Sequence, residues 1–275
     1  MNALDGFGAL VTGGGSGIGL AAAKRLAADG AVVTICGRSK ERLDAALDEL
    51  GGGVRTIVAD VTVEDDVAAA VAAAADAPRG LRIAVANAGG SSQMGPLVAT
   101  GLAEFRDTVE VNVVGTFLTI KHAAPHLVRN GGGSIVAVSS IAAAVSHPYL
   151  GAYAVGKAGI DMLTKVAADE LGRSNVRVNA VRPGLVDTEL VAGIFATPEV
   201  LDSYLTQTPL GRAGDANEIA ELIRFLAGPE SAWITGQAIS IDGGHSLRRG
   251  PDYTPFAEPV YGADALRGIP PPPPT

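Results

Sequence analysis

The chain has few of the features that mark secreted, membrane-spanning or nucleic-acid-binding proteins. Its one cysteine, Cys36, cannot form an internal disulfide, which favours a reducing compartment. A net charge of −8 offers no basic surface for nucleic acid. Apolar runs are short and flanked by charge, and the first strand begins too early to leave room for a signal peptide. We therefore expect a cytoplasmic protein that binds neither nucleic acid nor a membrane.

The 275 residues, 47% of them hydrophobic, are enough to bury a large core. Short β-branched or apolar runs alternate along the chain with segments of helical periodicity. The expected strands are 8–11, 32–36, 55–59, 82–86, 134–138, 177–181 and 237–241. This alternation predicts a single α/β domain over residues 1–245, with a doubly wound parallel sheet and helices on both faces. Residues 246–275 form a C-terminal extension with a proline-rich end.

A glycine-rich turn separates the first strand from the first helix, which is expected at 20–26. Its sequence is Thr12-Gly13-Gly14-Gly15-Ser16-Gly17-Ile18-Gly19. Glycine allows a tight turn and the close approach of a phosphate, and the helix that follows presents backbone N–H groups at the positive end of its dipole. The turn lacks the Gly-Lys-Ser/Thr ending of a P-loop, so the pyrophosphate of a dinucleotide is the favoured ligand.

Two side chains on a later helix have the spacing of a general acid/base pair. Tyr153 and Lys157 lie four residues apart and therefore on one helix face. A free tyrosine has a pKa of about 10, and a nearby cation lowers that pKa by stabilising the phenolate. The same spacing also fits an ordinary exposed helix, so the pair alone leaves both interpretations open. Ser140, at the end of a strand upstream, favours catalysis because its hydroxyl is suited to polarise a carbonyl oxygen.

Together these features resemble the short-chain dehydrogenase/reductase family over residues 9–244. The resemblance rests on the order and spacing of Thr12-Gly13-x-x-x-Gly17-x-Gly19, Asp60-Val61, Asn87-Ala88-Gly89, Asn112-x-x-Gly115, Ser139-Ser140, Tyr153-x-x-x-Lys157, Pro183-Gly184-x-Val186-x-Thr188 and Asp242-Gly243-Gly244. It implies a Rossmann-type sheet of about seven strands in the order 3-2-1-4-5-6-7. It also implies an NAD(P)-dependent oxidoreductase that transfers a hydride between the nicotinamide and a secondary alcohol or ketone.

The resemblance implies roles for individual residues as well. Tyr153 donates or accepts the proton, and Ser140 holds the substrate oxygen. Lys157 binds the nicotinamide ribose and lowers the Tyr153 pKa, while Asn112 anchors a water in the proton relay. Ser139 is expected to support the turn. The implied cofactor-binding residues are Thr12, Gly13, Gly15, Ser16, Gly17, Ile18, Gly19, Arg38, Asp60, Val61, Asn87, Ala88, Gly89, Tyr153, Lys157, Pro183, Gly184, Val186 and Thr188.

Cofactor preference depends on the residues that follow the second strand. A carboxylate there accepts a hydrogen bond from the adenosine ribose 2′-hydroxyl and selects NAD. This chain has Gly37 at that position, followed by Arg38, whose guanidinium is suited to bind a 2′-phosphate. We therefore predict that NADP(H) is favoured over NAD(H). The alternative is that Arg38 only stacks on the adenine, which would leave the enzyme tolerant of both cofactors.

The substrate is less well defined than the reaction. We expect a small, mostly apolar molecule, with a 3-oxoacyl thioester (of acyl carrier protein or CoA) or a steroid-type hydroxy/keto compound as alternatives. An enoyl reductase is disfavoured because such relatives commonly separate their tyrosine and lysine further than Tyr153 and Lys157 are separated here. A remote alternative from another class is a dinucleotide-sensing scaffold without catalysis, although it would have no need of all four catalytic residues.

The histidines predict no metal site. His122 and His126 are spaced like a metal-binding pair. However, no glutamate lies between them as in the His-Glu-x-x-His motif, and no third ligand is evident. His147, between Ser140 and Tyr153, is a candidate for the substrate pocket, but the favoured interpretation is a solvated loop residue.

Four segments carry further structural expectations. Residues 103–127 predict one long helix whose end is bent by Pro125. Residues 189–212 have weak periodicity and predict a mobile flap. The family resemblance implies a homotetramer that packs through the helices from Ala103 and Tyr153. The residues agree with this, because the face of Ala154, Ala158, Ile160, Asp161 and Leu163 is poor in charge. Residues 246–261 combine aromatic side chains with prolines, which favours an ordered segment docked on its own or a neighbouring subunit.

Overall fold

Seven parallel strands form one sheet in the order β3-β2-β1-β4-β5-β6-β7, as predicted. The structure is a computed structural model, and it describes residues 3–51, 53–91, 94–247, 263, 264, 267 and 269. The strands are β1 (Gly8–Thr12), β2 (Val32–Gly37), β3 (Arg55–Val58), β4 (Leu81–Ala86), β5 (Gly133–Val138), β6 (Val176–Pro183) and β7 (Ala238–Ile241). From β1 the chain adds β2 and β3 on one side, and it then returns to add β4 to β7 on the other side. Open α/β sheets bind ligands at the point where the strand order reverses in this way, which here lies between β1 and β4.

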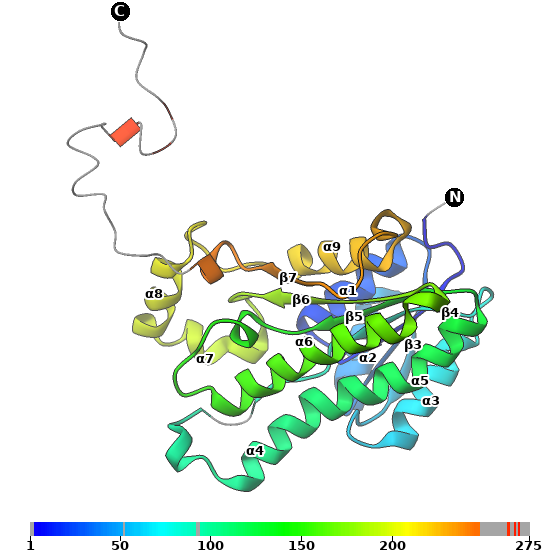
Figure 1. Cartoon of the computed structure of the whole chain (residues 1–275), viewed down its shortest axis with the longest axis horizontal. Helices are drawn as coiled ribbons and strands as arrows, with labels where there is room; N and C mark the ends of the chain where they lie inside the picture. Colours follow the sequence, from blue (N-terminus) through cyan, green and yellow to red (C-terminus); the bar gives the residue numbers. More distant parts are fainter. Residues whose placement is uncertain are drawn as a thin grey trace, which may run out of the picture.

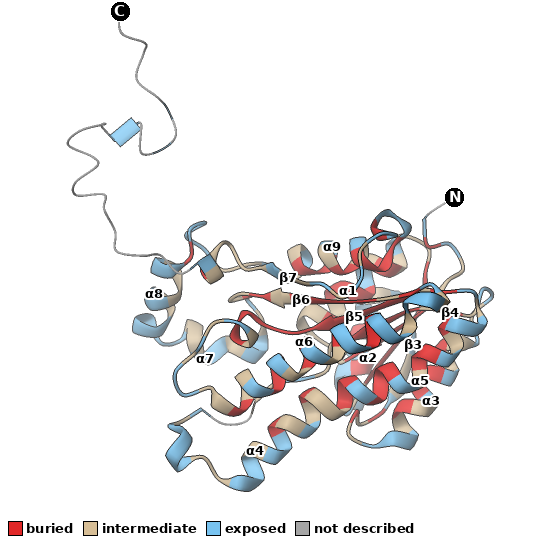
Figure 2. Cartoon of the chain, in the orientation of Figure 1, coloured by how far each residue is buried: buried red, intermediate tan, exposed pale blue. Residues whose placement is uncertain are grey.

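Helices cover both faces of the sheet (Figure 1). The helices, apart from the short turns, are α1 (Gly17–Ala28), α2 (Lys40–Leu50), α3 (Glu64–Ala75), α4 (Leu102–Val109), α5 (Gly115–Arg129), α6 (Gly151–Leu171), α7 (Ala192–Phe195), α8 (Pro198–Gln207) and α9 (Ala216–Ala227). One hydrophobic core joins the sheet to α1, α2 and α9, and a second joins it to α3, α5 and α6. Figure 2 shows the buried residues on the strands and on the helix faces that meet them.

The strands supply both cores because successive side chains point to opposite faces of a sheet. In β1, Ala9 and Val11 belong to the first core, whereas Leu10 belongs to the second. Continuous apolar strands are therefore required, which is the pattern the sequence has. Cys36 lies in the second core, where burial raises the pKa of its thiol to about 12 and leaves it unreactive, as expected of a core residue.

The predicted long helix is interrupted, and Pro125 does not end it. Residues Glu110–Val114 form a π-helical turn, η2, between α4 and α5. Such a turn carries one extra residue, which periodicity alone does not reveal, and it is typical of functional positions. Helix α5 passes through Pro125 and ends only at Arg129. The helix therefore ends two residues beyond the predicted end at Leu127.

The segment after β6 is helical where the sequence predicted a flap. A 3₁₀ turn, η5 (Glu189–Val191), leads into α7 and then α8, whose first residue is Pro198. Proline suits the first turn of a helix because its missing N–H would have no partner there. The weak periodicity arises because neither helix has a fully buried residue. These short elements stand at the carboxyl ends of the strands.

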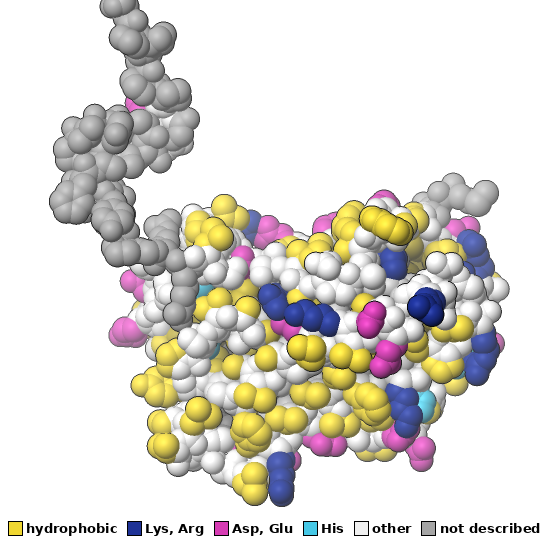
Figure 3. Space-filling view, viewed as in Figure 1, with side chains coloured by type: hydrophobic (Ala, Val, Ile, Leu, Met, Phe, Trp, Pro, Cys, Tyr) yellow, Lys and Arg dark blue, Asp and Glu magenta, His cyan; other side chains and the backbone are white. Residues whose placement is uncertain are grey.

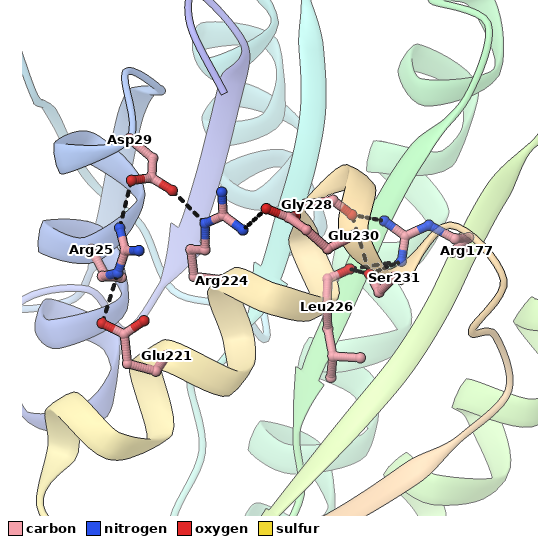
Figure 4. Close-up of polar contacts among 9 residues, drawn as sticks. All are labelled: Arg25, Asp29, Arg177, Glu221, Arg224, Leu226, Gly228, Glu230 and Ser231. Carbon is pink, nitrogen blue, oxygen red and sulfur yellow. Dashed lines mark hydrogen bonds and ion pairs between the residues drawn. The ribbon is translucent and has the colours of Figure 1, made fainter. Parts of the chain in front are cut away.

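At the opposite end of the sheet, a charged network joins α1 to α9 (Figure 4). Asp29 follows α1 and accepts hydrogen bonds from Arg25 and from Arg224 of α9. Arg224 also pairs with Glu230, at 2.5 Å. Nearby, Arg177 of β6 donates to the Leu226 and Gly228 carbonyls at the end of α9. Paired charges therefore join the elements at this end of the molecule. The cavity lies at the other end, along the carboxyl ends of the strands.

Within the described residues, no helix combines the length and apolarity needed to cross a membrane. The expectation of an ordered docking segment over residues 246–261 falls largely on residues 248–261, which lie outside the described part of the chain.

Candidate active site

A cavity of about 820 Å³ opens along the carboxyl ends of β1, β2, β4, β5 and β6. The site residues expected from the sequence that line it are Gly13, Gly15, Ser16, Gly17, Ile18, Gly19, Arg38, Asp60, Val61, Asn87, Ala88, Gly89, Ser140, Tyr153, Pro183, Gly184, Val186 and Thr188. Three further expected residues, Thr12, Asn112 and Lys157, lie behind the wall. One cavity therefore collects residues spread over most of the domain.

The glycine turn forms the floor of this cavity. Gly13 has a φ of 64°, a conformation that favours glycine, and a Cβ there would stand 2.9 Å from the Asn87 amide nitrogen. A Cβ on Gly19 would collide with the Gly13 carbonyl, so helix α1 packs close beneath the turn only because residue 19 is glycine. Ser16 is at the N-cap position of α1, but its side chain makes no hydrogen bond to the backbone of the helix. The first N–H groups of α1 therefore face the cavity without a side-chain acceptor, as a phosphate site requires.

Thr12 holds the turn rather than lining the cavity. Its hydroxyl accepts hydrogen bonds from the backbone N–H groups of Asn87, at 3.0 Å, and Ala88, at 3.1 Å. The Asn87 amide in turn donates to the carbonyls of Thr12 and Gly13. These bonds join the ends of β1 and β4, so that the glycine turn and the Asn87-Ala88-Gly89 segment keep a fixed spacing.

Tyr153 and Ser140 meet at the wall of the cavity. Tyr153 is in the first turn of α6, and Ser140 caps the 3₁₀ turn Ile141–Ala143 after β5, accepting a hydrogen bond from the Ala142 N–H at 3.1 Å. Burial raises the pKa of Tyr153, a hydrogen bond with Ser140 lowers it, and the nearby Tyr204 raises it slightly. The net pKa of Tyr153 is raised, and Lys157 is not among the groups that shift it in this structure. The reason is that the Lys157 ammonium faces elsewhere.

Lys157 is buried, with 3% of its surface exposed. Its Nζ donates to the Val138 carbonyl at 2.9 Å and lies 5.5 Å from the centre of the Tyr153 ring. Burial lowers the pKa of Lys157 to about 8, and the charge of Asp161 only partly opposes this. Ser139 supports the same helix, because its hydroxyl donates to the Lys157 carbonyl at 3.1 Å.

Gly89 separates this buried lysine and Asn112 from the cavity. A Cβ on residue 89 would stand 2.6 Å from the Asn112 Oδ1 and 3.1 Å from the Lys157 Nζ. Asn112, in the π-helical turn, is fully buried. Its side chain donates to the carbonyls of Gly90 and Thr108 at 2.7 Å and accepts from the Gly90 N–H at 3.2 Å. The glycine at 89 thus lets two polar side chains approach the cavity wall from behind.

Two charged residues mark the far end of the cavity, near β2 and β3. Asp60 follows β3 and accepts from the N–H and the hydroxyl of Thr62. Burial raises the Asp60 pKa, but these bonds and the nearby Arg38 outweigh it, and the net pKa is lowered. Gly37 is open on its cavity side, since a Cβ there would meet only Leu43, at 3.9 Å. No carboxylate stands at the end of β2, as the sequence indicates.

The sequence did not predict that two groups of residues come together near the cavity. Arg42 of α2 pairs with Glu189 of η5 at 2.8 Å, and both line the cavity. His147, Tyr204 and His245 form a cluster of three rings whose centres are 5.5 to 6.1 Å apart. His147 is therefore half-buried against two rings rather than solvated. Neither group had a local signal, because its members come from distant segments.

His122 makes an ordinary side-chain contact. His122 lies 3.0 Å from the Glu64 carboxylate, which also pairs with Lys121. Over the part of the chain that the structure describes, no group of three or more His, Cys, Asp or Glu side chains is arranged to hold a metal ion.

Comparison with known proteins identifies the family. A family model described as enoyl-(acyl carrier protein) reductase matches residues 13–246. Cis-4-hydroxycyclohexanecarboxylate dehydrogenase of Sinomonas cyclohexanicum is 39% identical over 240 residues, 86% of this chain and 96% of that protein. Galactitol 2-dehydrogenase (L-tagatose-forming) of Cereibacter sphaeroides is 37% identical over 248 residues, 89% of this chain and 96% of that protein.

A solved structure, described as a short-chain type dehydrogenase/reductase from Mycobacterium ulcerans, superposes with a TM-score of 0.87. It is 46% identical and covers 97% of this chain and 99% of its own. The chain belongs to the short-chain dehydrogenase/reductase family. It is an NAD(P)-dependent oxidoreductase that acts on CH–OH groups.

Proposed function

We propose that this enzyme transfers a hydride between NADP(H) and a secondary alcohol or ketone on a small, mostly apolar substrate, with Tyr153, Ser140, Lys157 and Asn112 as the catalytic residues. The observation that carries the proposal is that Tyr153 and Ser140 line the same wall of a cavity floored by glycine, close enough for Ser140 to lower the pKa of Tyr153. The cavity fits a dinucleotide because its glycines admit a close phosphate and the first turn of α1 offers N–H donors.

The nicotinamide, when bound, supplies or accepts the hydride. In reduction, the hydroxyls of Ser140 and Tyr153 donate to the substrate carbonyl oxygen, and Tyr153 gives up its proton as the alcohol forms. In oxidation, the Tyr153 phenolate takes the alcohol proton. Because burial raises the Tyr153 pKa, the protein favours the phenol and hence the proton-donor state at neutral pH.

Lys157 and Asn112 support this proton transfer from behind Gly89. We propose that the Lys157 ammonium binds the nicotinamide ribose. It would reach the ribose past Gly89, where a side chain would block the way. Its charge there would stabilise the phenolate of Tyr153, whose ring centre is 5.5 Å away. Asn112 would anchor the water through which the proton leaves, for which the π-helical turn provides an irregular backbone.

The remaining cofactor contacts follow the cavity wall. Arg38 would bind the 2′-phosphate, and Asp60 and Val61 would lie against the adenine, since all three line the cavity. Asn87, Ala88 and Gly89 would contact the middle of the cofactor, and the segment from Pro183 to Thr188 would bind the carboxamide. A 3-oxoacyl thioester and a steroid-type compound stay as alternative substrates. The single buried thiol and the acidic composition favour a cytoplasmic location.

We further propose a homotetramer, with the helices from Ala103 (α4 and α5) and from Tyr153 (α6) at one interface. The face expected for it needs correction, because Ile160 and Asp161 point inward and are buried. The exposed apolar side chains of α6 are instead Val155, Met162 and Val166, and hydrophobic side chains gather in this region of the surface in Figure 3. Light scattering at micromolar concentration tests the assembly, since a monomeric mass would refute it.

A turnover screen tests the proposed function directly. Secondary alcohols and ketones of increasing size and polarity are followed at the nicotinamide absorbance with each cofactor. We expect turnover of apolar cyclic or linear substrates with NADP(H). Binding of cofactor with no turnover of any alcohol or ketone would instead favour the non-catalytic scaffold.

A further inference from the structure

An ion pair crosses the cavity at the end where the adenosine is proposed to bind. Arg42, in the first turn of α2, donates from its guanidinium to the Glu189 carboxylate at 2.8 Å. The two residues are 147 positions apart in the chain, and both line the cavity. Their side chains are 57% and 69% exposed, so solvent reaches both partners of the pair.

The segment that carries Glu189 touches the cavity floor on either side of this pair. A Cβ on Gly17 would stand 3.3 Å from the Thr188 methyl, and a Cβ on Gly90 would stand 3.8 Å from a methyl of Leu190. Glu189 therefore belongs to a strap, residues 188–190, that spans the cavity between the glycine turn and the end of β4. The Arg42–Glu189 pair connects this strap to α2.

Arg42 is a second cation beside Arg38, and each of the two faces a carboxylate. Arg38 is close enough to Asp60 to lower its pKa, whereas Arg42 is bonded to Glu189. The side chain of Arg42 begins beside the phosphate-binding turn, since a Cβ on Gly15 would lie 3.4 Å from the Arg42 Cβ. Ser39, which lies between them in the sequence, also lines the cavity, and its hydroxyl accepts a hydrogen bond from the Arg42 backbone N–H at 3.2 Å.

We propose that Arg42 is a second ligand of the cofactor 2′-phosphate, and that Glu189 occupies the same guanidinium until the phosphate displaces it. The proposal rests on the NADP(H) preference proposed above and adds to it a second specificity residue and an internal competitor. A phosphate dianion forms charge-assisted, bidentate bonds with arginine, whereas an exposed carboxylate pair is weak. The 2′-phosphate therefore displaces Glu189 from the Arg42 guanidinium. Loss of the ion pair releases residues 188–190 from α2 as the cofactor enters.

Calorimetry with adenosine fragments isolates the phosphate because neither fragment contains the nicotinamide. The probes are 2′,5′-ADP and 5′-AMP, which differ only in the 2′-phosphate. The variants are Arg42→Gln and Glu189→Gln. Asp44→Asn is the matched control, since Asp44 forms an equally exposed pair with Lys40 on the same helix, at 2.6 Å, and lies outside the cavity wall.

We expect Arg42→Gln to weaken 2′,5′-ADP binding about tenfold and 5′-AMP binding less than about twofold. Glu189→Gln should tighten 2′,5′-ADP binding by about two- to fivefold, the range that an exposed ion pair allows, and leave 5′-AMP unchanged. Asp44→Asn should change neither. Melting temperatures of all three variants verify that the fold is intact.

Different failures point to different steps of the account. Equal weakening of both fragments by Arg42→Gln would assign Arg42 to the 5′-phosphate and overturn the inference. Weaker 2′,5′-ADP binding in Glu189→Gln would contradict the competitor role. In either case the unmodified enzyme would still oxidise alcohols, so the proposed function would stand. Failure of both fragments to bind the unmodified protein would instead count against the dinucleotide site itself.

Discussion

The Lys157 ammonium is bonded to the Val138 carbonyl at the end of β5, at 2.9 Å, and not to the Tyr153 phenol. This bond fixes the second turn of α6 to the central sheet and turns the cation toward Gly89. The arrangement keeps a charge in a site from which water is excluded, so that its attraction for an entering ribose or phenolate is strong. The same burial makes that charge unfavourable for folding.

A first prediction concerns this stability. Burial lowers the Lys157 pKa from 10.5 to about 8, a difference that corresponds to roughly 3 kcal/mol of folding free energy. Below pH 8 the folded state bears the full penalty, because it must hold the charged form. Between pH 8 and 10.5 the unfolded chain binds more protons, so stability rises with pH. Relative to Lys157→Met, the unmodified protein should gain stability over that range.

Urea unfolding of both proteins from pH 7 to pH 10 measures this gain. The comparison cancels groups that titrate alike in the two proteins. A constant difference in unfolding free energy across the whole range would show that Lys157 keeps its ordinary pKa in the fold.

A second prediction concerns cofactor choice. Gly37 has open space on its cavity side, so an aspartate fits at the end of β2 without a clash. Gly37→Asp combined with Arg38→Leu supplies an acceptor for the ribose 2′-hydroxyl and removes a cation. We expect kcat/KM to shift from favouring NADP(H) to favouring NAD(H). Equal or better use of NAD(H) by the unmodified enzyme would contradict the preference assigned to Arg38.

The sheet was predictable from the sequence because its determinants are local. Each strand is a short apolar run such as 32–36, and glycine marks the turn that follows β1. The positions of Tyr153 and Ser140 follow from the strand and helix that carry them. The π-helical turn at Asn112 was not predictable, because one extra residue in a helix leaves the apolar pattern nearly unchanged.

Long-range contacts between loops were also beyond sequence reasoning. Glu189 reaches Arg42 across 147 residues, and His147, Tyr204 and His245 come from three separate segments. Only the packing of the segments after β2, β5, β6 and β7 brings these side chains together. The pKa of Tyr153 depends on the same packing, because burial determines that the pKa is raised. A sequence motif does not indicate how deeply a side chain is buried.

A third prediction concerns the ring cluster. Tyr204 packs against the rings of His147 and His245, which also contact each other, and it is close enough to Tyr153 to influence its pKa. We expect Tyr204→Ala to raise the substrate KM about tenfold by removing an aromatic surface beside the reacting group, with cofactor affinity unchanged. Tyr204→Phe keeps the ring and is the matched control. An unchanged KM in Tyr204→Ala would place the cluster outside the substrate site.

Tyr153→Phe tests the central claim most directly, because it removes one hydroxyl and keeps the ring that packs in the wall. The measurement pairs kcat for an alcohol identified in the screen with the dissociation constant of NADPH. We predict a loss of at least about a thousandfold in kcat with cofactor affinity changed less than about twofold. A variant that keeps most of its activity would contradict the assignment of Tyr153 as the proton donor and acceptor.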